Sequence, residues 1–162
     1  MKQGDLVFCH NTDIVSRAIR WGEWLRFRKG DYYNHVGTLD VQVPQSDDWF
    51  VIEAIGHGVT NLGRLSSLVK PGGTYTIVPA PDGVNTDKQM EFLNEQVGDH
   101  YGFLTIASII TTLLSPAFIN VMLPNTWICS ALAAEALRAG GWIHCWPDLY
   151  QVNPAQLFEA LS

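Results

Sequence analysis

Short apolar runs bounded by turn-forming residues predict strands in the first half of the chain. Residues 6–10 form one such run directly after a Gly-Asp pair. Residues 35–43 and 49–55 form two more, and the polar segment 44–48 between them predicts a hairpin. A fourth strand is expected at 74–78, because glycines and prolines bound it on both sides.

Apolar residues at helical spacing dominate most of the other segments. Thr86 and Gln89 have the spacing of a capping box, and Gly98 is a typical residue at which a helix stops. Asn153 followed by Pro154 is typical of a helix start. We therefore expect helices at 13–27, 86–97, 101–114, 127–139 and 154–161.

The segregation of strands from helices favours an α+β fold, with an antiparallel sheet packed against helices. The absence of repeats and polar linkers predicts a single domain over 1–162. A net charge of −6 argues against a nucleic-acid partner, because binding phosphates requires clustered cations. The cations do cluster once, at Arg17, Arg20, Arg26, Arg28 and Lys29. We interpret this cluster as a solvated face, and a polyanion site is the alternative.

Three cysteines are present, at Cys9, Cys129 and Cys145. An odd number without C-x-x-C spacing argues against a disulfide framework and against a structural zinc site. The adjacent pairs Cys9-His10 and His144-Cys145 offer no third ligand at a recognisable spacing, so we expect no metal. Reduced thiols and an N-terminus without an apolar secretory stretch predict a cytoplasmic location for the sequence as given.

Residues 103–123 contain no charged side chain, and this length reaches that of a membrane span. The segment also holds six Ser, Thr and Asn residues and is interrupted by Pro116. We therefore favour a buried helix that ends near Ser115 and is followed by an apolar loop. Peripheral membrane contact is the second interpretation, and a true span is the third.

Cys129 follows an extended approach that begins with Pro124 and leads into a helix-forming sequence. It should therefore lie in the first helical turn, where free amides and the helix dipole stabilise a thiolate. Cysteine hydrolases prepare their nucleophile in this way. The alternative is a small buried hydrophobe, which is the more common role for a cysteine when this feature is considered alone.

His35 and Glu53 are candidate partners for this cysteine. His35 begins a predicted strand, where an imidazole can take a proton from a thiol on a facing helix. Glu53 is an acid within an apolar strand, and a buried carboxylate is costly unless it is paired. In a hairpin, Glu53 can orient His35 as the third member of a triad. The alternatives are a histidine at a strand edge and a glutamate that faces solvent.

Seven motifs along the chain together carry a family resemblance. They are Gly4-Asp5-Leu6-Val7-Phe8, Ser16-Arg17-Ala18-Ile19, Asn34-His35-Val36-Gly37, Val51-Ile52-Glu53-Ala54, Gly98-Asp99-His100-Tyr101-Gly102, Cys129-Ser130 and Asn153-Pro154-Ala155-Gln156-Leu157. In this order they resemble the circularly permuted branch of the NlpC/P60 superfamily, particularly the YiiX/YebB-like proteins, and more distantly the lecithin:retinol acyltransferase-like enzymes. In that branch the histidine strand precedes the cysteine helix, as it does here. The resemblance implies a permuted papain-like fold with Cys129 as nucleophile, His35 as base and Glu53 as the orienting residue.

The resemblance further implies acyl transfer through a thioacyl-enzyme intermediate, without a cofactor. The expected substrate is a peptide, as in bacterial cell-wall stems, or an acyl lipid, which the apolar segment 103–123 mildly favours. A non-catalytic binding or assembly module that retains the fold is the alternative. A structural protein anchored to a membrane by 103–123 is a third interpretation.

Overall fold

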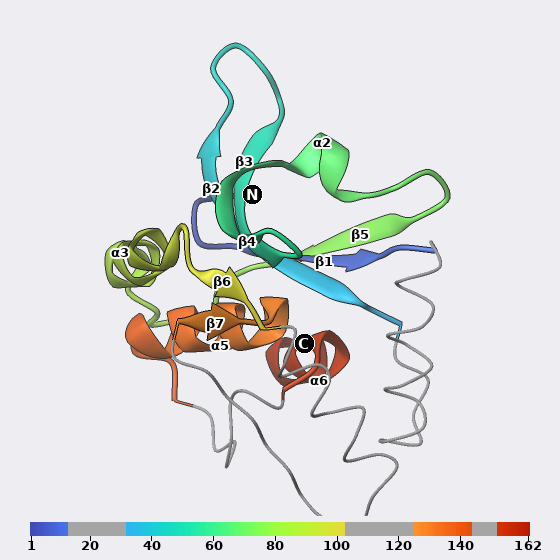
Figure 1. Cartoon of the computed structure of the whole chain (residues 1–162). Coiled ribbons are helices and arrows are strands. Elements are labelled where there is room, and N and C mark those ends of the chain that lie inside the picture. Colours follow the sequence, from blue (N-terminus) through green and yellow to red (C-terminus); the bar gives the residue numbers. More distant parts are fainter. Residues whose placement is uncertain (13–31, 103–124, 144–151) are drawn as a thin grey trace, which may run out of the picture.

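The computed structural model describes residues 1–12, 32–102, 125–143 and 152–162. Their fold is α+β and is built on a five-stranded antiparallel sheet (Figure 1). The strands are β1 (Leu6–His10), β2 (His35–Gln42), β3 (Trp49–Ile55), β4 (Gly58–Arg64) and β5 (Thr74–Val78). Their order across the sheet is β4-β3-β2-β1-β5, so β1 and β2 occupy its interior together with β3.

Helices and a second, small sheet complete the described part of the chain. The helices are α2 (Leu65–Leu68), α3 (Thr86–Gln96), α5 (Cys129–Ala139) and α6 (Pro154–Leu161). The small sheet pairs β6 (His100–Tyr101) with β7 (Thr126–Trp127) in parallel. In Figure 1, α5 and α6 lie below the large sheet, and α3 lies beside α5.

The alternation of side chains along each strand builds a core on both faces of the sheet. Phe8 and Val36 are directly opposite each other and pack, together with α5 and α6, in one cluster. Val7 and Leu39 point to the other face and pack in the cluster that contains residues of α2. One face is therefore covered by the long helices, and the other is closed in part by a single helical turn.

Small side chains let α5 approach the sheet closely. Most of its residues are buried, and alanine accounts for many of them. Ala133 and Ala134 contact the cluster that contains Phe8, whereas Ala131 and Ala136 contact the cluster around Ile52. Alanine costs no side-chain entropy on burial and has the highest helix propensity, so this sequence suits a buried central helix. The start of α5 is thereby held at a fixed position against β2 and β3.

All four predicted strands are confirmed. The strand at 6–10 is β1, those at 35–43 and 49–55 are the β2–β3 hairpin, and the strand at 74–78 is β5. The helix at 154–161 is also confirmed. Its capping box joins Asn153 and Gln156, with Pro154 in the first turn.

Two helix starts differ from expectation. Asn85, rather than Thr86, caps α3 by accepting from the Lys88 N–H, while Gln89 is buried and donates to the Gly4 carbonyl. The predicted capping box is therefore wrong, because the side chain of Gln89 binds the backbone of Gly4 instead of the start of its own helix. The helix expected at 127–139 begins two residues later, since Thr126 and Trp127 pair with β6.

Two predicted helices fall wholly or largely beyond the described part of the chain. The helix at 13–27 lies outside it, and so does the helix at 101–114 from residue 103 onward; Tyr101 belongs to β6. Within the described ranges, no helix is long and apolar enough to cross a membrane. The uncharged segment 103–123 is outside those ranges.

Candidate active site

Cys129 lies in the first turn of its helix, as the sequence predicts, and is the first residue of α5. Ile128 before it is extended, with φ −99° and ψ 154°, and provides no side-chain cap. The Trp127 indole N–H donates to Asp99 Oδ2 at 3.0 Å, and the Gly102 N–H donates to the Trp127 carbonyl at 3.0 Å. These hydrogen bonds fix the backbone just before the helix. The position of Cys129 is therefore set by β6 and β7 as well as by α5.

His35 is the first residue of β2 and lies opposite Cys9 of β1. The preceding residue, Asn34, is buried and donates to the Asn11 carbonyl at 2.7 Å. Asn34 Oδ1 in turn accepts from the Asn11 N–H at 3.2 Å, and its own N–H donates to the Cys9 carbonyl. These hydrogen bonds hold the start of the strand and thus the backbone that carries His35. Asn34 is therefore a support for the histidine.

Glu53 meets His35 across the hairpin. His35 Nε2 lies 2.6 Å from Glu53 Oε2, and the glutamate is 7% exposed. The register Thr38↔Ile52, continued toward the start of β2, makes Glu53 a diagonal neighbour of His35. Diagonal pairs on one face are within reach of long side chains, so the hairpin explains this contact.

The sulfur of Cys129 meets β2 at the edge that faces β3. The Leu39 N–H points toward β1, where it donates to Asp5. The Val36 N–H, three residues earlier, points the opposite way, and the ladder to β3 begins only at Thr38. The Val36 N–H therefore donates to the Cys129 sulfur, and the Ser130 N–H does so as well. Both hydrogen bonds favour a thiolate.

The ionisation of Cys129 and His35 is strongly coupled. Burial alone raises the pKa of Cys129, but the charge and hydrogen bond of His35 and the two backbone N–H groups outweigh burial and lower it. Burial alone lowers the pKa of His35, but the Cys129 thiolate and then Glu53 raise it to about 10. Each group therefore favours the charged form of the other, a thiolate beside an imidazolium. Because Glu53 engages Nε2, Nδ1 is the ring nitrogen that can serve the sulfur.

Tyr101 is a neighbour of Cys129 that sequence reasoning did not single out. It is partly buried and packs against the cluster that contains Trp127 and Ile128. Burial, and then the negative charge of Cys129, raise the pKa of Tyr101. Its phenol therefore stays protonated and can donate a hydrogen bond in the site. The pairing of β6 with β7 brings it there, and no local sequence pattern predicts two-residue strands.

Asp5 and Cys9 are buried residues whose contacts stabilise the fold. Asp5 is buried and accepts from the backbone N–H groups of Lys2 and Ala80, which ties the chain before β1 to the segment after β5. Cys9 is fully buried among the apolar residues of the α2 face. Burial first, and then Glu53 and Cys129, raise the pKa of Cys9 to about 12. Cys9 is therefore a thiol, and an unreactive one at neutral pH.

Cys9 and His10, one of the two adjacent Cys-His pairs, differ in their surroundings. Cys9 is buried, whereas the His10 ring stacks on Tyr32 at 4.2 Å between centroids. No group of three potential ligands occurs in the part of the chain that the structure describes. His144 and Cys145 lie outside that part.

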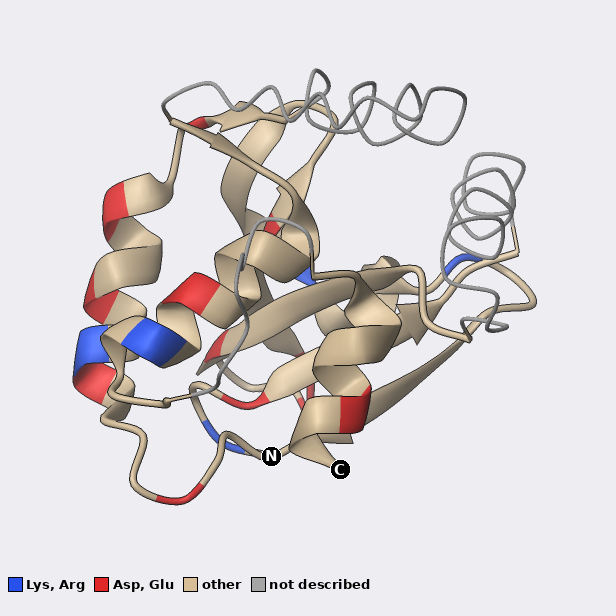
Figure 2. Ribbon diagram, turned by 90° about the horizontal axis from the view of Figure 1, so that it is seen from below, with Lys and Arg blue, Asp and Glu red and all other residues tan. Residues whose placement is uncertain are grey.

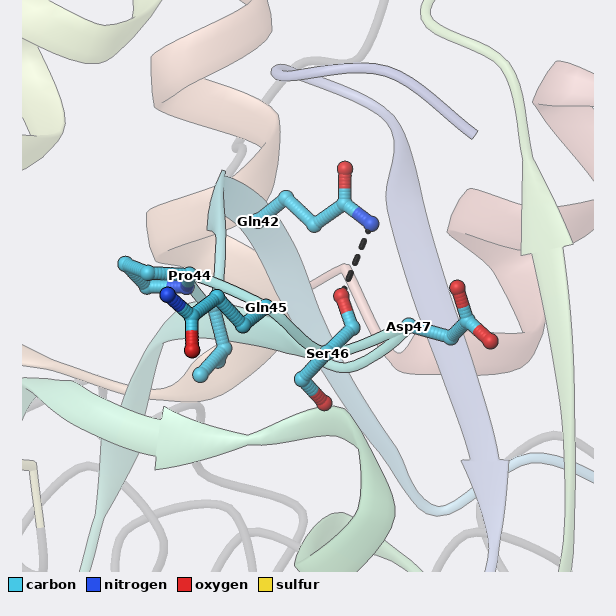
Figure 3. Close-up of a pocket in the computed structure, with 6 residues that line it drawn as sticks. Gln42, Pro44, Gln45, Ser46 and Asp47 are labelled. Carbon is cyan, nitrogen blue, oxygen red and sulfur yellow. Dashed lines mark hydrogen bonds between the residues drawn. The ribbon is translucent and has the colours of Figure 1, made fainter.

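A surface hollow at the far end of the hairpin is separate from this site. Residues 42–47 line it, and Gln42 Nε2 donates to the Ser46 carbonyl across the turn at 2.9 Å (Figure 3). His35 and Gln42 are the two ends of β2, which puts them roughly 23 Å apart at the usual rise per residue. The hollow therefore belongs to the turn.

Acidic residues outnumber basic ones in the described part of the chain (Figure 2). Asp87, Glu91 and Glu95 follow one another along α3. The basic cluster that contains Arg17 and Arg28 lies outside the described ranges.

Comparison with known proteins gives no assignment for this arrangement. No family model matches the chain, and no curated protein matches it significantly in sequence.

Proposed function

We propose that this chain is a papain-like cysteine hydrolase or acyltransferase in circularly permuted order. Cys129 is the nucleophile, His35 the base, and Glu53 the residue that orients His35. The observation that carries this proposal is the 2.6 Å contact between His35 Nε2 and Glu53 Oε2, made where His35 also pairs with a cysteine at a helix start. This is the nucleophile, base and orienting group of a triad, recognised by geometry rather than by chain position.

Chain order and fold class support the permuted form. The histidine strand β2 precedes the cysteine helix α5, as in the permuted NlpC/P60 branch that the sequence motifs resemble. An antiparallel sheet with the cysteine helix packed on one face is also what that branch requires.

The chemistry follows from the resting thiolate and imidazolium. The Cys129 thiolate attacks a carbonyl carbon, and the carbonyl electron pair moves to oxygen. The first N–H groups of α5 have no acceptor within the helix, so they suit the resulting oxyanion. The His35 imidazolium gives its proton to the leaving amine or alcohol, which leaves a thioacyl enzyme. Water or an acceptor then attacks the thioester and gives its proton to His35. The acyl group leaves the sulfur, which restores the thiolate and the imidazolium.

The substrate on this proposal is an amide or an ester, from a cell-wall-type peptide or an acyl lipid. The uncharged sequence 103–123 favours an acyl chain, because such a chain needs an apolar surface, and it would also suit peripheral contact with a membrane. Product analysis with peptidoglycan stem peptides and with acyl lipids, in parallel, separates the two classes. Release of amino acids supports the first, and loss or transfer of a fatty acyl group supports the second.

The direct test is the pH dependence of Cys129 alkylation by iodoacetamide, resolved by site with mass spectrometry. Cys129 should react well below the ordinary thiol pKa of about 8.5, and His35→Ala should abolish this low-pH reactivity. His10→Ala is the matched control, because the His10 ring stacks on Tyr32. The buried Cys9, whose pKa is raised to about 12, serves as an unreactive internal reference. An unreactive Cys129, or one that is indifferent to His35, overturns the proposal in favour of a binding module that retains the fold.

A further inference from the structure

The carboxylate of Glu53 occupies a narrow space between two neighbouring strands. On the β4 side it lies against Gly63, where an added Cβ would collide with Glu53 Oε1. That Cβ would also lie 3.3 Å from Glu53 Cδ and 3.3 Å from the Val51 carbonyl oxygen. Because Oε2 is the oxygen that contacts His35, the second oxygen rests directly on the glycine backbone.

A bulge in β4 creates this arrangement. Gly63 pairs with Val51, but Thr60 rather than Asn61 pairs with Glu53, so β4 has one extra residue between the two pairs. Val51 and Glu53 point to the same face, two residues apart on one strand. The bulge therefore leaves Gly63 beside the carboxylate, and Leu62 next to it is 79% exposed. Bulges of this kind re-aim side chains and are common beside active sites.

We propose that Gly63 is a positioning residue for the triad: its missing side chain provides the space in which the Glu53 carboxylate lies turned toward His35. This inference rests on the function proposed above, since it assigns a role to the same site. A larger residue must push the carboxylate away, because the Val51 carbonyl behind it is backbone and does not yield. His35 then loses the partner that holds its ring and favours its charge.

The test is Gly63→Ala, with the pH dependence of Cys129 alkylation as the readout. The midpoint of reactivity should rise by about one pH unit, which is a tenfold loss of rate at pH values below it. A variant that is only less stable, but keeps the triad, would retain the wild-type midpoint. A wild-type midpoint in folded Gly63→Ala therefore overturns the inference.

Gly37→Ala is the matched control. Gly37 lies on β2, which flanks β3 on the side opposite to β4. Its added Cβ would lie 2.5 Å from Val51 Cγ1 but 3.5 Å from Glu53 Cβ, which is ordinary contact. The same substitution there strains a hydrocarbon side chain in the same sheet and leaves the carboxylate in place. It should lower stability and keep the wild-type midpoint.

The double variant Glu53→Ala/Gly63→Ala makes the test independent of turnover. Without the carboxylate, the added methyl group loses its closest clash and keeps only the 3.3 Å contact with the Val51 carbonyl oxygen. Gly63→Ala should therefore cost more stability in the wild type than in the Glu53→Ala background. If Gly63→Ala does not fold, the double variant should fold. An equal cost in both backgrounds, or two unfolded proteins, overturns the inference. Failure of the proposed function is distinct, because it leaves the wild-type Cys129 unreactive whatever residue 63 is.

Discussion

Two negatively charged neighbours, Cys129 and Glu53, stabilise the His35 imidazolium in its partly buried position. Its side chain is 17% exposed, and burial alone would favour the neutral ring. The Cys129 thiolate counteracts burial most strongly, and Glu53 adds to it. The cysteine is therefore more than the group on which the histidine acts, because it also keeps the histidine charged.

This ranking predicts the effect of removing each partner on the pKa of His35. A nearby opposite charge shifts a pKa by about 1 to 3 units, so Cys129→Ala should lower the pKa of His35 by roughly 2 units and Glu53→Gln by roughly 1. Long-range ¹H–¹⁵N spectra of the imidazole, titrated from pH 5 to 11, measure both. Glu135→Gln is the control, because Glu135 pairs with Arg138 on α5. A larger effect of Glu53→Gln than of Cys129→Ala would contradict the ranking.

At the scale of elements, the site depends on where α5 begins. The pairing of β7 with β6 ends just before the helix, and the bond from Trp127 to Asp99 reinforces it. Trp127 is buried, so its indole N–H would have to find another acceptor if Asp99 were removed. The small sheet thus connects the packing of the molecule to the position of Cys129.

Asp99→Ala should destabilise the protein by about 1 to 3 kcal/mol, because it removes the charged acceptor of the part-buried hydrogen bond from the Trp127 indole. It should also slow alkylation of Cys129, since the approach to α5 loosens. Asp99→Asn keeps an acceptor oxygen and should cost less on both counts. Urea unfolding and the alkylation assay measure the two effects. Asp82→Ala in an exposed turn is the control, and an equal loss there would contradict the role of Asp99.

The elements that local sequence predicts well are those bounded by clear turn signals. The strands β1, β2, β3 and β5 are apolar runs between glycines, prolines or polar segments, and they occur where expected. β4 was missed, because its polar and glycine positions resemble a loop until β3 pairs with it. The two-residue strands β6 and β7 exist only through their pairing.

The same distinction holds within the site. Cys129 and His35 stand at a helix start and a strand start, which are features of the local sequence. The contact of Glu53 with His35 requires the hairpin, and the sequence could only raise it as a hypothesis. The place of Gly63 depends on a bulge in the β3–β4 register, so no local pattern indicates it.

At the scale of the whole molecule, the thiolate–imidazolium pair links the site to stability. In the unfolded chain, His35 takes its ordinary pKa of 6.5 and Cys129 its ordinary 9.0. The raised pKa of His35 contributes stability that is fully present below pH 6.5 and is lost as pH rises toward about 10. The lowered pKa of Cys129 contributes stability that is present above pH 9.0 and is lost as pH falls through its folded value.

Together these opposite dependences predict a pH range in which the pair leaves the free energy of unfolding independent of pH. Where the folded protein holds a thiolate and an imidazolium while the unfolded chain holds a thiol and a neutral imidazole, each state binds one proton. The pair then makes no net contribution to the pH dependence of stability. Below pH 6.5 the unfolded chain binds a second proton, whereas the folded pair does so only as the pH falls through the lowered pKa of Cys129. The free energy of unfolding should then fall with decreasing pH by about 1.4 kcal/mol per unit more steeply than in Cys129→Ala, which cannot form the pair.

Urea unfolding of both proteins from pH 5 to 9 measures this difference, with other titrating groups cancelling between them. Two parallel profiles would mean that Cys129 is an ordinary thiol in the folded protein. A wild-type free energy of unfolding that falls relative to that of Cys129→Ala as pH decreases would instead show that the folded chain keeps its thiolate where the unfolded chain has none. Because the proposed reaction requires that thiolate, the protein would then contribute part of its folding free energy to holding Cys129 charged.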